Sequence, residues 1–282
     1  MLTVILAACN TAKPAAPKSL NVVTSMDFYA EAAQAVLGDH GHATAIINQP
    51  NIDPHDYTPT TAVGKLVAKA DVIVANGAGY DTWLNKLVKG SGTASTMVSV
   101  ASVIGVKTGQ NEHIWYKPQT MPKLANQLAQ TYSKRDPKHK TAYTRNAKAY
   151  IASLKPLLTL IDQLKANAHG QSVAVSEPVF NNALQYLGYN ISNVHFANAI
   201  EEGSDPSAAD VRQLQADIAN HKLAFFVQNT QVDSKLINNL VKQCRQANIP
   251  VLKVTETLPA HQTYTQWMTS QYKALAKIQN AK

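Results

Sequence analysis

The sequence is poor in cysteine and in charged residues, and it has no long apolar run. Only Cys9 and Cys244 occur among the 282 residues, so a disulfide framework is excluded. The one membrane-like stretch, residues 1–8, is far shorter than the roughly 20 apolar residues that span a bilayer. We therefore expect no transmembrane helix. With 45% hydrophobic and 16% charged residues, the chain can instead bury a large core.

Familiar catalytic signatures are absent as well. The sequence contains no HExxH helix, no GxSxG elbow and no glycine-rich loop of the kind that binds phosphate. The formal net charge of +8 favours anionic surfaces, but the densest basic run, residues 134–140, is not interleaved with aromatic residues. We therefore predict a protein that is not an enzyme and that does not bind nucleic acid.

Strand and helix patterns alternate in two blocks separated by a long helical stretch. In the first block we expect strands at 20–25, 43–47, 71–77 and 97–106, with helices at 28–37 and 60–70. A helix with apolar residues at helical spacing follows over about 137–168, and Pro156 should kink it. The second block predicts strands at 172–176, around Val194, at 223–228 and at 250–255, and helices at 178–187, 207–220, 234–248 and 263–278.

This alternation predicts an α/β fold built from parallel sheets. The expected architecture has two lobes, each a parallel β-sheet flanked by helices, bridged by one long rigid α-helix. We expect a signal remnant and tether at 1–19, an N-terminal lobe at 20–136, the linking helix at 137–169 and a C-terminal lobe at 170–282. Ligands of open α/β sheets bind outside the carboxyl ends of the strands, so the loops there are the first candidates for a site.

Four residues with metal-binding side chains lie at strand ends or on stiff loops. His55 stands between two prolines, His113 precedes a short helical segment, Glu177 follows one expected strand and Glu256 follows another. Two imidazoles and two carboxylates suit a borderline or hard divalent ion. Such a site needs neutral imidazoles, so we expect affinity to fall as the pH drops through the ordinary histidine range near 6.5.

Other interpretations of these residues stay open at this point. A histidine before a helix is more often a surface residue, and Glu177 could simply favour a helix N-terminus. Asn229 and Asp233 are alternative fourth ligands, although both also suit turns and helix caps. His40 and His42 could form a minor second site, but a solvated turn is the better interpretation.

Several segments resemble the zinc/manganese-binding lipoproteins that serve bacterial ABC importers. The first-ligand motif is residues 53–60 (DPHDYTPT), and Trp83 follows it at a similar place. The second resembling segment is 113–118 (HIWYKP), the third is 176–180 (SEPVF) and the fourth is 249–258 (IPVLKVTETL). The resemblance extends from about residue 20 to the C-terminus. It implies two lobes joined by a rigid helix, with the metal bound between them.

The resemblance also implies a function. The protein would capture Zn²⁺ or Mn²⁺ outside the cytoplasm through His55, His113, Glu177 and Glu256, and would deliver the ion to the permease of an ABC importer. Two carboxylates lean slightly toward Mn²⁺, whereas intrinsic affinity favours Zn²⁺. The alternatives are a surface adhesin on the same scaffold and, with less support, a metal-dependent hydrolase.

The N-terminal residues predict an anchor. Residues 6–9 (LAAC) have the order of a lipobox, in which Cys9 would be lipidated, and the polar run after it resembles a flexible tether. We therefore expect a monomer anchored by lipid to the outer face of the cytoplasmic membrane. Cys244 lies in an amphipathic helix pattern and is interpreted as a small core residue.

Overall fold

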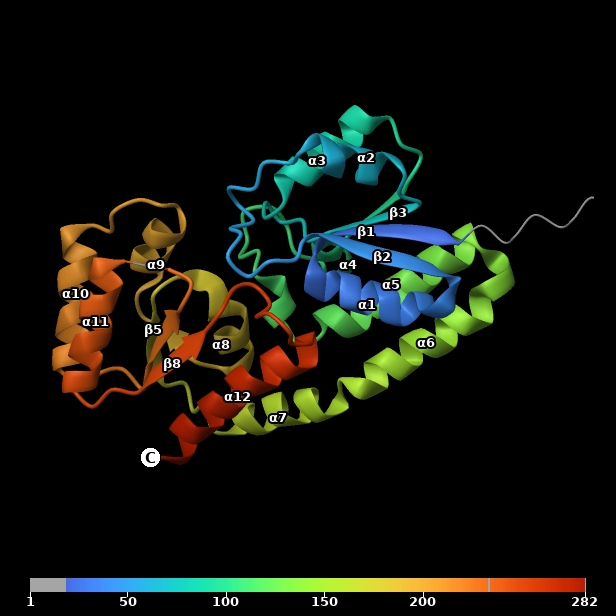
Figure 1. The fold of residues 1–282 in the computed structure, drawn as a ribbon. Helices are drawn as coiled ribbons and strands as arrows, with labels where there is room; N and C mark the ends of the chain where they lie inside the picture. Colours follow the sequence, from blue (N-terminus) through green and yellow to red (C-terminus); the bar gives the residue numbers. More distant parts are fainter. Residues whose placement is uncertain (1–18, 233, 282) are drawn as a thin grey trace, which may run out of the picture.

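The structure, a computed structural model, describes residues 19–232 and 234–281. The predicted lipidation residue Cys9 and the alternative ligand Asp233 lie outside the described residues. The chain folds into two lobes, each built on one four-stranded parallel sheet (Figure 1). The α/β fold with two parallel sheets is therefore as predicted. No helix within the described ranges combines the length and the apolar character that crossing a bilayer requires.

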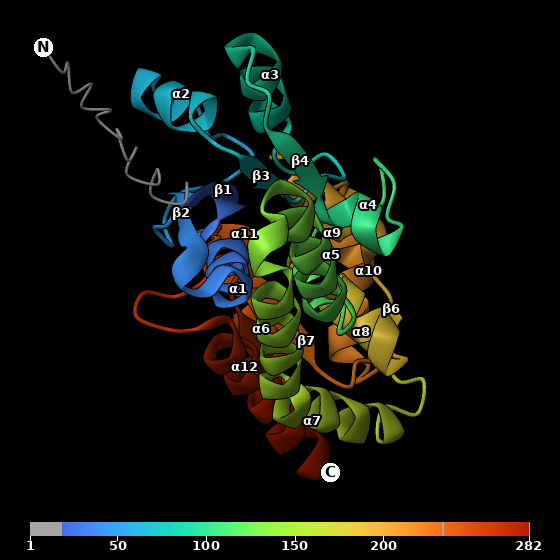
Figure 2. The same cartoon turned by 90° about the vertical axis from the view of Figure 1, so that its right-hand side faces the viewer.

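The N-terminal sheet has the strand order β2-β1-β3-β4, and all its neighbours are parallel. Its strands are β1 (Leu20–Met26), β2 (Gly41–Ile47), β3 (Val72–Ala75) and β4 (Thr96–Ser99). Helices α2 (Thr61–Ala68) and α3 (Thr82–Ser91) lie above the sheet in Figure 1. Below it, α1 (Asp27–Leu37) and α5 (Thr120–Arg135) pack side by side with α6 (Lys140–Ser153), as Figure 2 also shows.

The C-terminal sheet repeats this plan with the order β6-β5-β7-β8. Its strands are β5 (Ser172–Val175), β6 (Asn190–Ile191), β7 (Phe226–Asn229) and β8 (Val251–Val254). The flanking helices are α8 (Asn181–Leu187), α9 (Val194–Glu201), α10 (Ala208–Ala219), α11 (Lys235–Gln246) and α12 (Tyr264–Asn280). Cys244 is fully buried in α11, as predicted.

The connection between the lobes consists of two consecutive helices, α6 (Lys140–Ser153) and α7 (Lys155–Ala166), with Leu154 between them. Pro156 has no N–H to donate, so a regular helix cannot continue unbroken through this point. The chain tightens here: Leu154 N donates to the Ile151 carbonyl at 3.2 Å, three residues back. The helical bridge is therefore present and is divided where the proline predicted a kink.

Two of the strand predictions were wrong in part. The strand predicted over 97–106 ends at Ser99, whose hydroxyl accepts from Ser102 N at 3.3 Å and caps α4 (Val100–Ile104). The strand predicted around Val194 is helix α9, because the Asn193 side chain bonds both backbone groups of Val175. This side-chain pairing takes the place of a further strand ladder beside β5. It matters for function because α9 carries a residue of the site.

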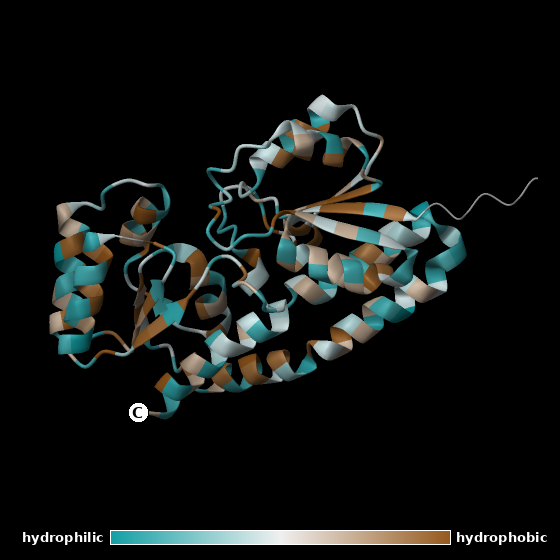
Figure 3. Ribbon diagram, viewed as in Figure 1, coloured by the Kyte–Doolittle hydropathy of each residue, from teal (hydrophilic) through white to brown (hydrophobic). Residues whose placement is uncertain are grey.

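The hydrophobic core is continuous between the lobes, since one cluster contains buried residues of both sheets. Figure 3 shows hydrophobic residues concentrated in the strands, whereas α10 and α11 alternate between hydrophilic and hydrophobic bands. Aromatic residues join the halves: the Tyr116 ring lies 4.9 Å from the Phe180 ring and 5.9 Å from that of Trp267. A packed interface of this kind limits how far one lobe can move against the other.

Candidate metal centre

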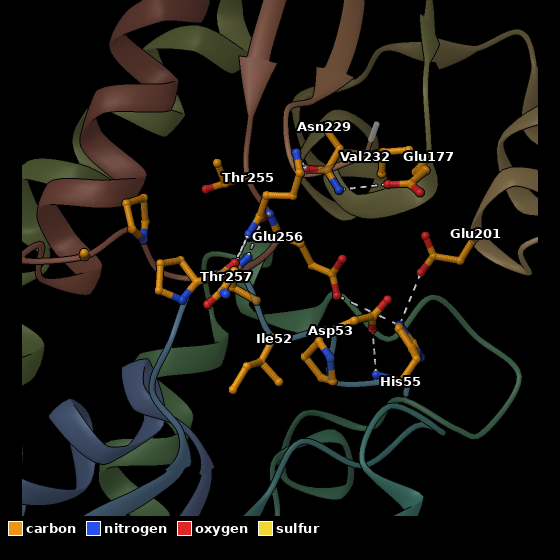
Figure 4. A pocket seen from close by; sticks show the side chains of 16 residues that line it. Ile52, Asp53, His55, Glu177, Glu201, Asn229, Val232, Thr255, Glu256 and Thr257 are labelled. Carbon is orange, nitrogen blue, oxygen red and sulfur yellow. Dashed lines mark hydrogen bonds and ion pairs between the residues drawn. The ribbon is translucent and has the colours of Figure 1, made fainter. Parts of the chain in front are cut away.

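Metal-competent side chains from both lobes meet beside a cleft with a cavity volume of about 470 Å³. His55 and His113 belong to the N-terminal lobe, whereas Glu177, Glu201 and Glu256 belong to the C-terminal lobe. Figure 4 shows Glu201 and Glu256 directed toward His55, and Glu177 directed toward Asn229. The site therefore lies between the lobes, next to loops at the carboxyl ends of strands, where open α/β sheets bind ligands.

His55 lies on the loop between β2 and α2, and two contacts hold this loop. The Asp53 carboxylate accepts from His55 N at 2.8 Å, and the indole nitrogen of Trp83 in α3 donates to the Pro54 carbonyl at 3.2 Å. The His55 side chain is 32% exposed. Burial alone would lower its pKa, but the contact with Glu201 and the charges of Glu256, Glu201 and Asp53 raise it to about 9.

His113 is fully buried, and neither of its ring nitrogens makes a hydrogen bond with a residue that the structure describes. Its backbone is fixed, because Asn111 Oδ1 accepts from His113 N at 3.0 Å and Asn182 Nδ2 donates to the His113 carbonyl at 2.9 Å. Burial lowers the pKa of His113 to about 4, although the Glu201 charge acts in the opposite direction. Buried polar atoms are nearly always paired, so this neutral imidazole with free nitrogens suits a metal ligand.

Glu256 follows β8 and is oriented by two side chains. The Tyr80 hydroxyl donates to Glu256 Oε1 at 2.8 Å, and Gln231 Oε1 accepts from the backbone N–H of Glu256 at 2.6 Å. Glu256 Oε1 lies 3.9 Å from His55 Nε2 and 3.8 Å from His113 Nε2. Burial, reinforced by the Glu201 charge, raises the pKa of Glu256 to about 8.

Glu201, at the end of α9, contacts both histidines. Its Oε1 lies 3.5 Å from His55 Nε2 and 3.3 Å from His113 Nε2, and within the described ranges this buried oxygen has no hydrogen bond of ordinary geometry. Burial acts to raise the pKa of Glu201, but the contacts with the two histidines outweigh it and hold the pKa below its ordinary value. Glu201 is therefore an ionised carboxylate directed at both imidazoles.

The spacing of these groups matches the size of a metal ion. The donor atoms of His55, His113 and Glu256 all lie within 4.8 Å of one another, and so do those of His55, Glu112 and Glu201. Two ligands of one zinc ion, each at about 2.1 Å, can be separated by up to about 4.2 Å. Only small side-chain movements are needed to bring either group onto one cation.

Glu177 lines the same cleft but contacts a different residue. Its Oε2 accepts from Asn229 Nδ2 at 2.8 Å, and burial raises its pKa to about 7. Among the described residues, the groups of histidine and carboxylate donor atoms within 4.8 Å of one another do not include Glu177. The structure thus brings His55, His113 and Glu256 together and adds Glu201. The ligand role of Glu177 stays a prediction, and the geometry favours Glu201.

Sequence reasoning missed Glu201 because the segment before it, around Val194, was interpreted as a strand, and no helix was expected that would end at Glu201. One signal was available. Glu201 and Glu202 stand at the C-terminal end of α9, where the helix dipole disfavours negative charge. Two carboxylates at an unfavourable helix end are a reason to look for a nearby cation.

His40 and His42, for which a solvated turn was preferred over a minor metal site, are not assembled as a metal centre. The His40 ring stacks on His139 with 3.9 Å between centroids and contacts Tyr143 edge-on. In the part of the chain that the structure describes, no group of three close donors includes His40 or His42.

Known proteins with a similar sequence or fold are metal-binding proteins by name. The chain matches the family described as "Zinc-uptake complex component A periplasmic" over residues 22–278. The zinc-binding lipoprotein AdcA of Streptococcus pneumoniae is 24% identical over 93% of this chain and 55% of its own length. The manganese-binding lipoprotein MntA of Halalkalibacterium halodurans is 26% identical over 66% of this chain and 64% of its own length.

Solved structures with a similar fold are also named as metal-binding proteins. The periplasmic zinc-binding protein TroA of Treponema pallidum superposes with a TM-score of 0.77 at 18% identity, covering 93% of this chain and 99% of that one. This chain spans about half the length of AdcA, the first curated relative. The family match covers nearly all described residues and confirms the resemblance that the motifs indicated. The chain belongs to the family of the periplasmic zinc-uptake complex component A.

Proposed function

We propose that this protein captures a divalent transition metal, Zn²⁺ or Mn²⁺, between its lobes and delivers it to the permease of an ABC importer. The observation that carries the proposal is His113, a fully buried imidazole whose Nε2 lies 3.3 Å from Glu201 Oε1 and whose two nitrogens make no hydrogen bond among the described residues. A bound cation would satisfy this group and the Glu201 carboxylate together. Relatives named for zinc and manganese binding support the same cargo.

The proposed ligands are His55, His113, Glu201 and Glu256, with Glu177 in the wall of the cleft. Two imidazoles and two carboxylates can complete a tetrahedral zinc site. The oxygen ligands also suit the harder Mn²⁺, whereas intrinsic affinity favours Zn²⁺. Four protein ligands leave no obvious position for an activated water, so we propose a binding protein without catalytic activity. The names of its relatives favour transport over an adhesin or a hydrolase.

The cellular setting is part of the proposal. The curated relatives AdcA and MntA are named lipoproteins, which supports lipidation at Cys9. We propose that the protein is a monomer held on the outer face of the cytoplasmic membrane. A lipid anchor would keep the loaded protein near its permease.

The direct test is metal titration of the purified full chain after chelator treatment. We expect binding of one ion per chain, and we expect His113→Ala to weaken it by more than the roughly 10–100-fold that losing an outer-shell partner costs. His42→Ala, which removes an exposed imidazole at the start of β2, is the matched control and should bind like the wild type. Absence of one-to-one binding in the wild type, or equal affinity in His113→Ala, would contradict the proposal.

A further inference from the structure

His55 belongs to two overlapping sets of donors. The inner triad is His55, His113 and Glu256, and the outer triad is His55, Glu112 and Glu201. His55 Nε2 lies 4.0 Å from Glu112 Oε1, about as far as it lies from Glu256 Oε1 at 3.9 Å. Glu112 is therefore as close to the shared imidazole as the inner carboxylate is.

The two triads differ in their access to solvent. The side chain of Glu112 is 24% exposed, compared with 14% for Glu256 and 0% for His113. An ion that arrives from water can thus reach Glu112 before it reaches His113. The outer triad is also richer in oxygen, with two carboxylates and one imidazole, so it suits an ion that still retains part of its hydration shell.

Two groups connect the triads. His55 is common to both, and Glu201 Oε1 lies 3.3 Å from His113 Nε2. That oxygen and both His113 nitrogens are buried and make no hydrogen bond in the part of the chain that the structure describes. His113 at the inner end therefore faces a member of the outer triad. An ion can move inward while His55 and Glu201 remain bound, exchanging Glu112 for His113 and Glu256.

We propose that the outer triad is the first binding site for the metal ion and that Glu112 acts as a transfer ligand. This inference rests on the proposed function, because it describes how the cargo enters the same centre. Glu112 holds the incoming ion, shares it with His55 and Glu201, and releases it when His113 and Glu256 complete the coordination. Glu112 is then absent from the final ligand set.

This role has a kinetic signature. Entry and exit follow the same path in opposite directions, so a residue that acts only on the path changes both rates by the same factor. Glu112→Gln should therefore slow association and dissociation by about fivefold each and leave the dissociation constant within about twofold of the wild type. A permanent ligand would behave differently, since its loss mainly raises the dissociation rate.

The experiment is stopped-flow mixing of the chelator-treated protein with Mn²⁺ or Zn²⁺, combined with a chelator chase for dissociation. Tryptophan fluorescence is a suitable signal, because the Trp115 ring lies 5.2 Å from the His113 ring. Glu202→Gln is the matched control: it removes the same charge from an exposed residue next to Glu201. Both rates of the control should stay within about twofold of the wild type, which separates ligand transfer from general electrostatic attraction.

Glu112→Asp keeps the charge on a shorter side chain and should recover part of both rates; thermal melting of each metal-free variant checks its fold. Equal association and dissociation rates in Glu112→Gln and Glu202→Gln would overturn the inference. A dissociation constant in Glu112→Gln that exceeds the wild-type value by more than about twofold would also overturn it. Either result leaves the proposed function intact if the wild type binds metal. A wild type that binds neither ion would overturn both proposals.

Discussion

Two carboxylates near the cleft differ in what they contact. Glu201 Oε1 faces His55 and His113 and makes no hydrogen bond among the described residues, whereas Glu177 Oε2 accepts from Asn229. Glu201→Gln removes the charge beside both imidazoles, so metal affinity should fall by about 100-fold, whereas Glu177→Gln should cost about tenfold at most. Chelator competition measures both. A larger loss in Glu177→Gln than in Glu201→Gln would restore Glu177 as the ligand.

The pKa values of the ligands set the pH dependence. In the metal-free protein the pKa of His55 is raised to about 9 and that of Glu256 to about 8, so both groups carry a proton at pH 7. The ion displaces these protons, and affinity should therefore rise with pH up to about 9, by about tenfold per pH unit for each proton released. His113, with a pKa of about 4, contributes no proton in this range.

Calorimetry at pH 7 in two buffers of different ionisation enthalpy measures this release directly, and we expect close to two protons per ion. The window differs from the one that the sequence suggested, near 6.5, because the neighbouring carboxylates stabilise the charged form of His55. Affinity that stays constant between pH 6 and 9 would show that both ligands are already deprotonated.

Three of the proposed ligands were identifiable from the sequence because each follows a rigid local pattern. His55 stands between prolines, His113 precedes a short helical turn and Glu256 follows an apolar strand. Glu201 and Glu112 have no such local pattern. The fold brings both to His55: α9 brings Glu201 from the other lobe, and the backbone before His113 brings Glu112 from within the N-terminal lobe. Both are tertiary relations. A linear pattern carries little information about such a relation.

At the scale of elements, the turn after β3 positions a residue of the site. The buried Asp81 carboxylate accepts from Asn76 N at 2.6 Å and from Gly77 N at 2.9 Å, and Tyr80 in this turn donates to Glu256. Gly77 has a φ of +78°, which favours glycine, and a Cβ there would lie 2.5 Å from Ser99 Oγ. The Ser99 hydroxyl caps α4, so it cannot move away freely.

Gly77→Ala should therefore lower the free energy of unfolding by about 1–3 kcal/mol and weaken metal binding through Tyr80. Gly90→Ala is the matched control, because Gly90 lies inside α3 with no atom within 4 Å of an added Cβ. That change should stabilise the protein by about 0.5–1 kcal/mol. Urea denaturation measures both. An unchanged free energy of unfolding in Gly77→Ala would show that the turn can relax.

Most elements were predictable because their signals are local. Strands β1, β3 and β5 are short, largely buried runs that contain several β-branched residues, and Pro156 marked the division between α6 and α7. The segment around Val194 was wrongly predicted to be a strand, because its few apolar residues fit both the strand period and the helix period. In the structure, the Asn193 side chain forms hydrogen bonds with the backbone of Val175, and helix α9 begins at the next residue. Those contacts depend on the finished sheet, so local propensity could not supply them.

At the scale of the whole molecule, the lobes are joined by more than the helical bridge. Asn111 Nδ2 donates to the Pro178 carbonyl at 2.7 Å, and Asn182 Nδ2 donates to the His113 carbonyl at 2.9 Å. The Tyr264 hydroxyl donates to the Trp115 carbonyl at 2.7 Å. These bonds lie within a continuous core, so separating the lobes would expose apolar surface and break buried hydrogen bonds.

We therefore expect metal binding to stabilise the protein without closing one lobe on the other. Because the ion binds only the folded state, an excess of 100 times the dissociation constant should add about 2.7 kcal/mol to the free energy of unfolding. Small-angle scattering should give the same radius of gyration with and without metal, and hydrogen exchange should slow mainly in the loop of His55 and the end of α9. These two segments carry donors and belong to different lobes, so their ordering around one ion accounts for the stabilisation. A marked decrease in the radius of gyration on loading would mean instead that the interlobe contacts rearrange, and the hinge would then have to be sought at Leu154, where α6 meets α7.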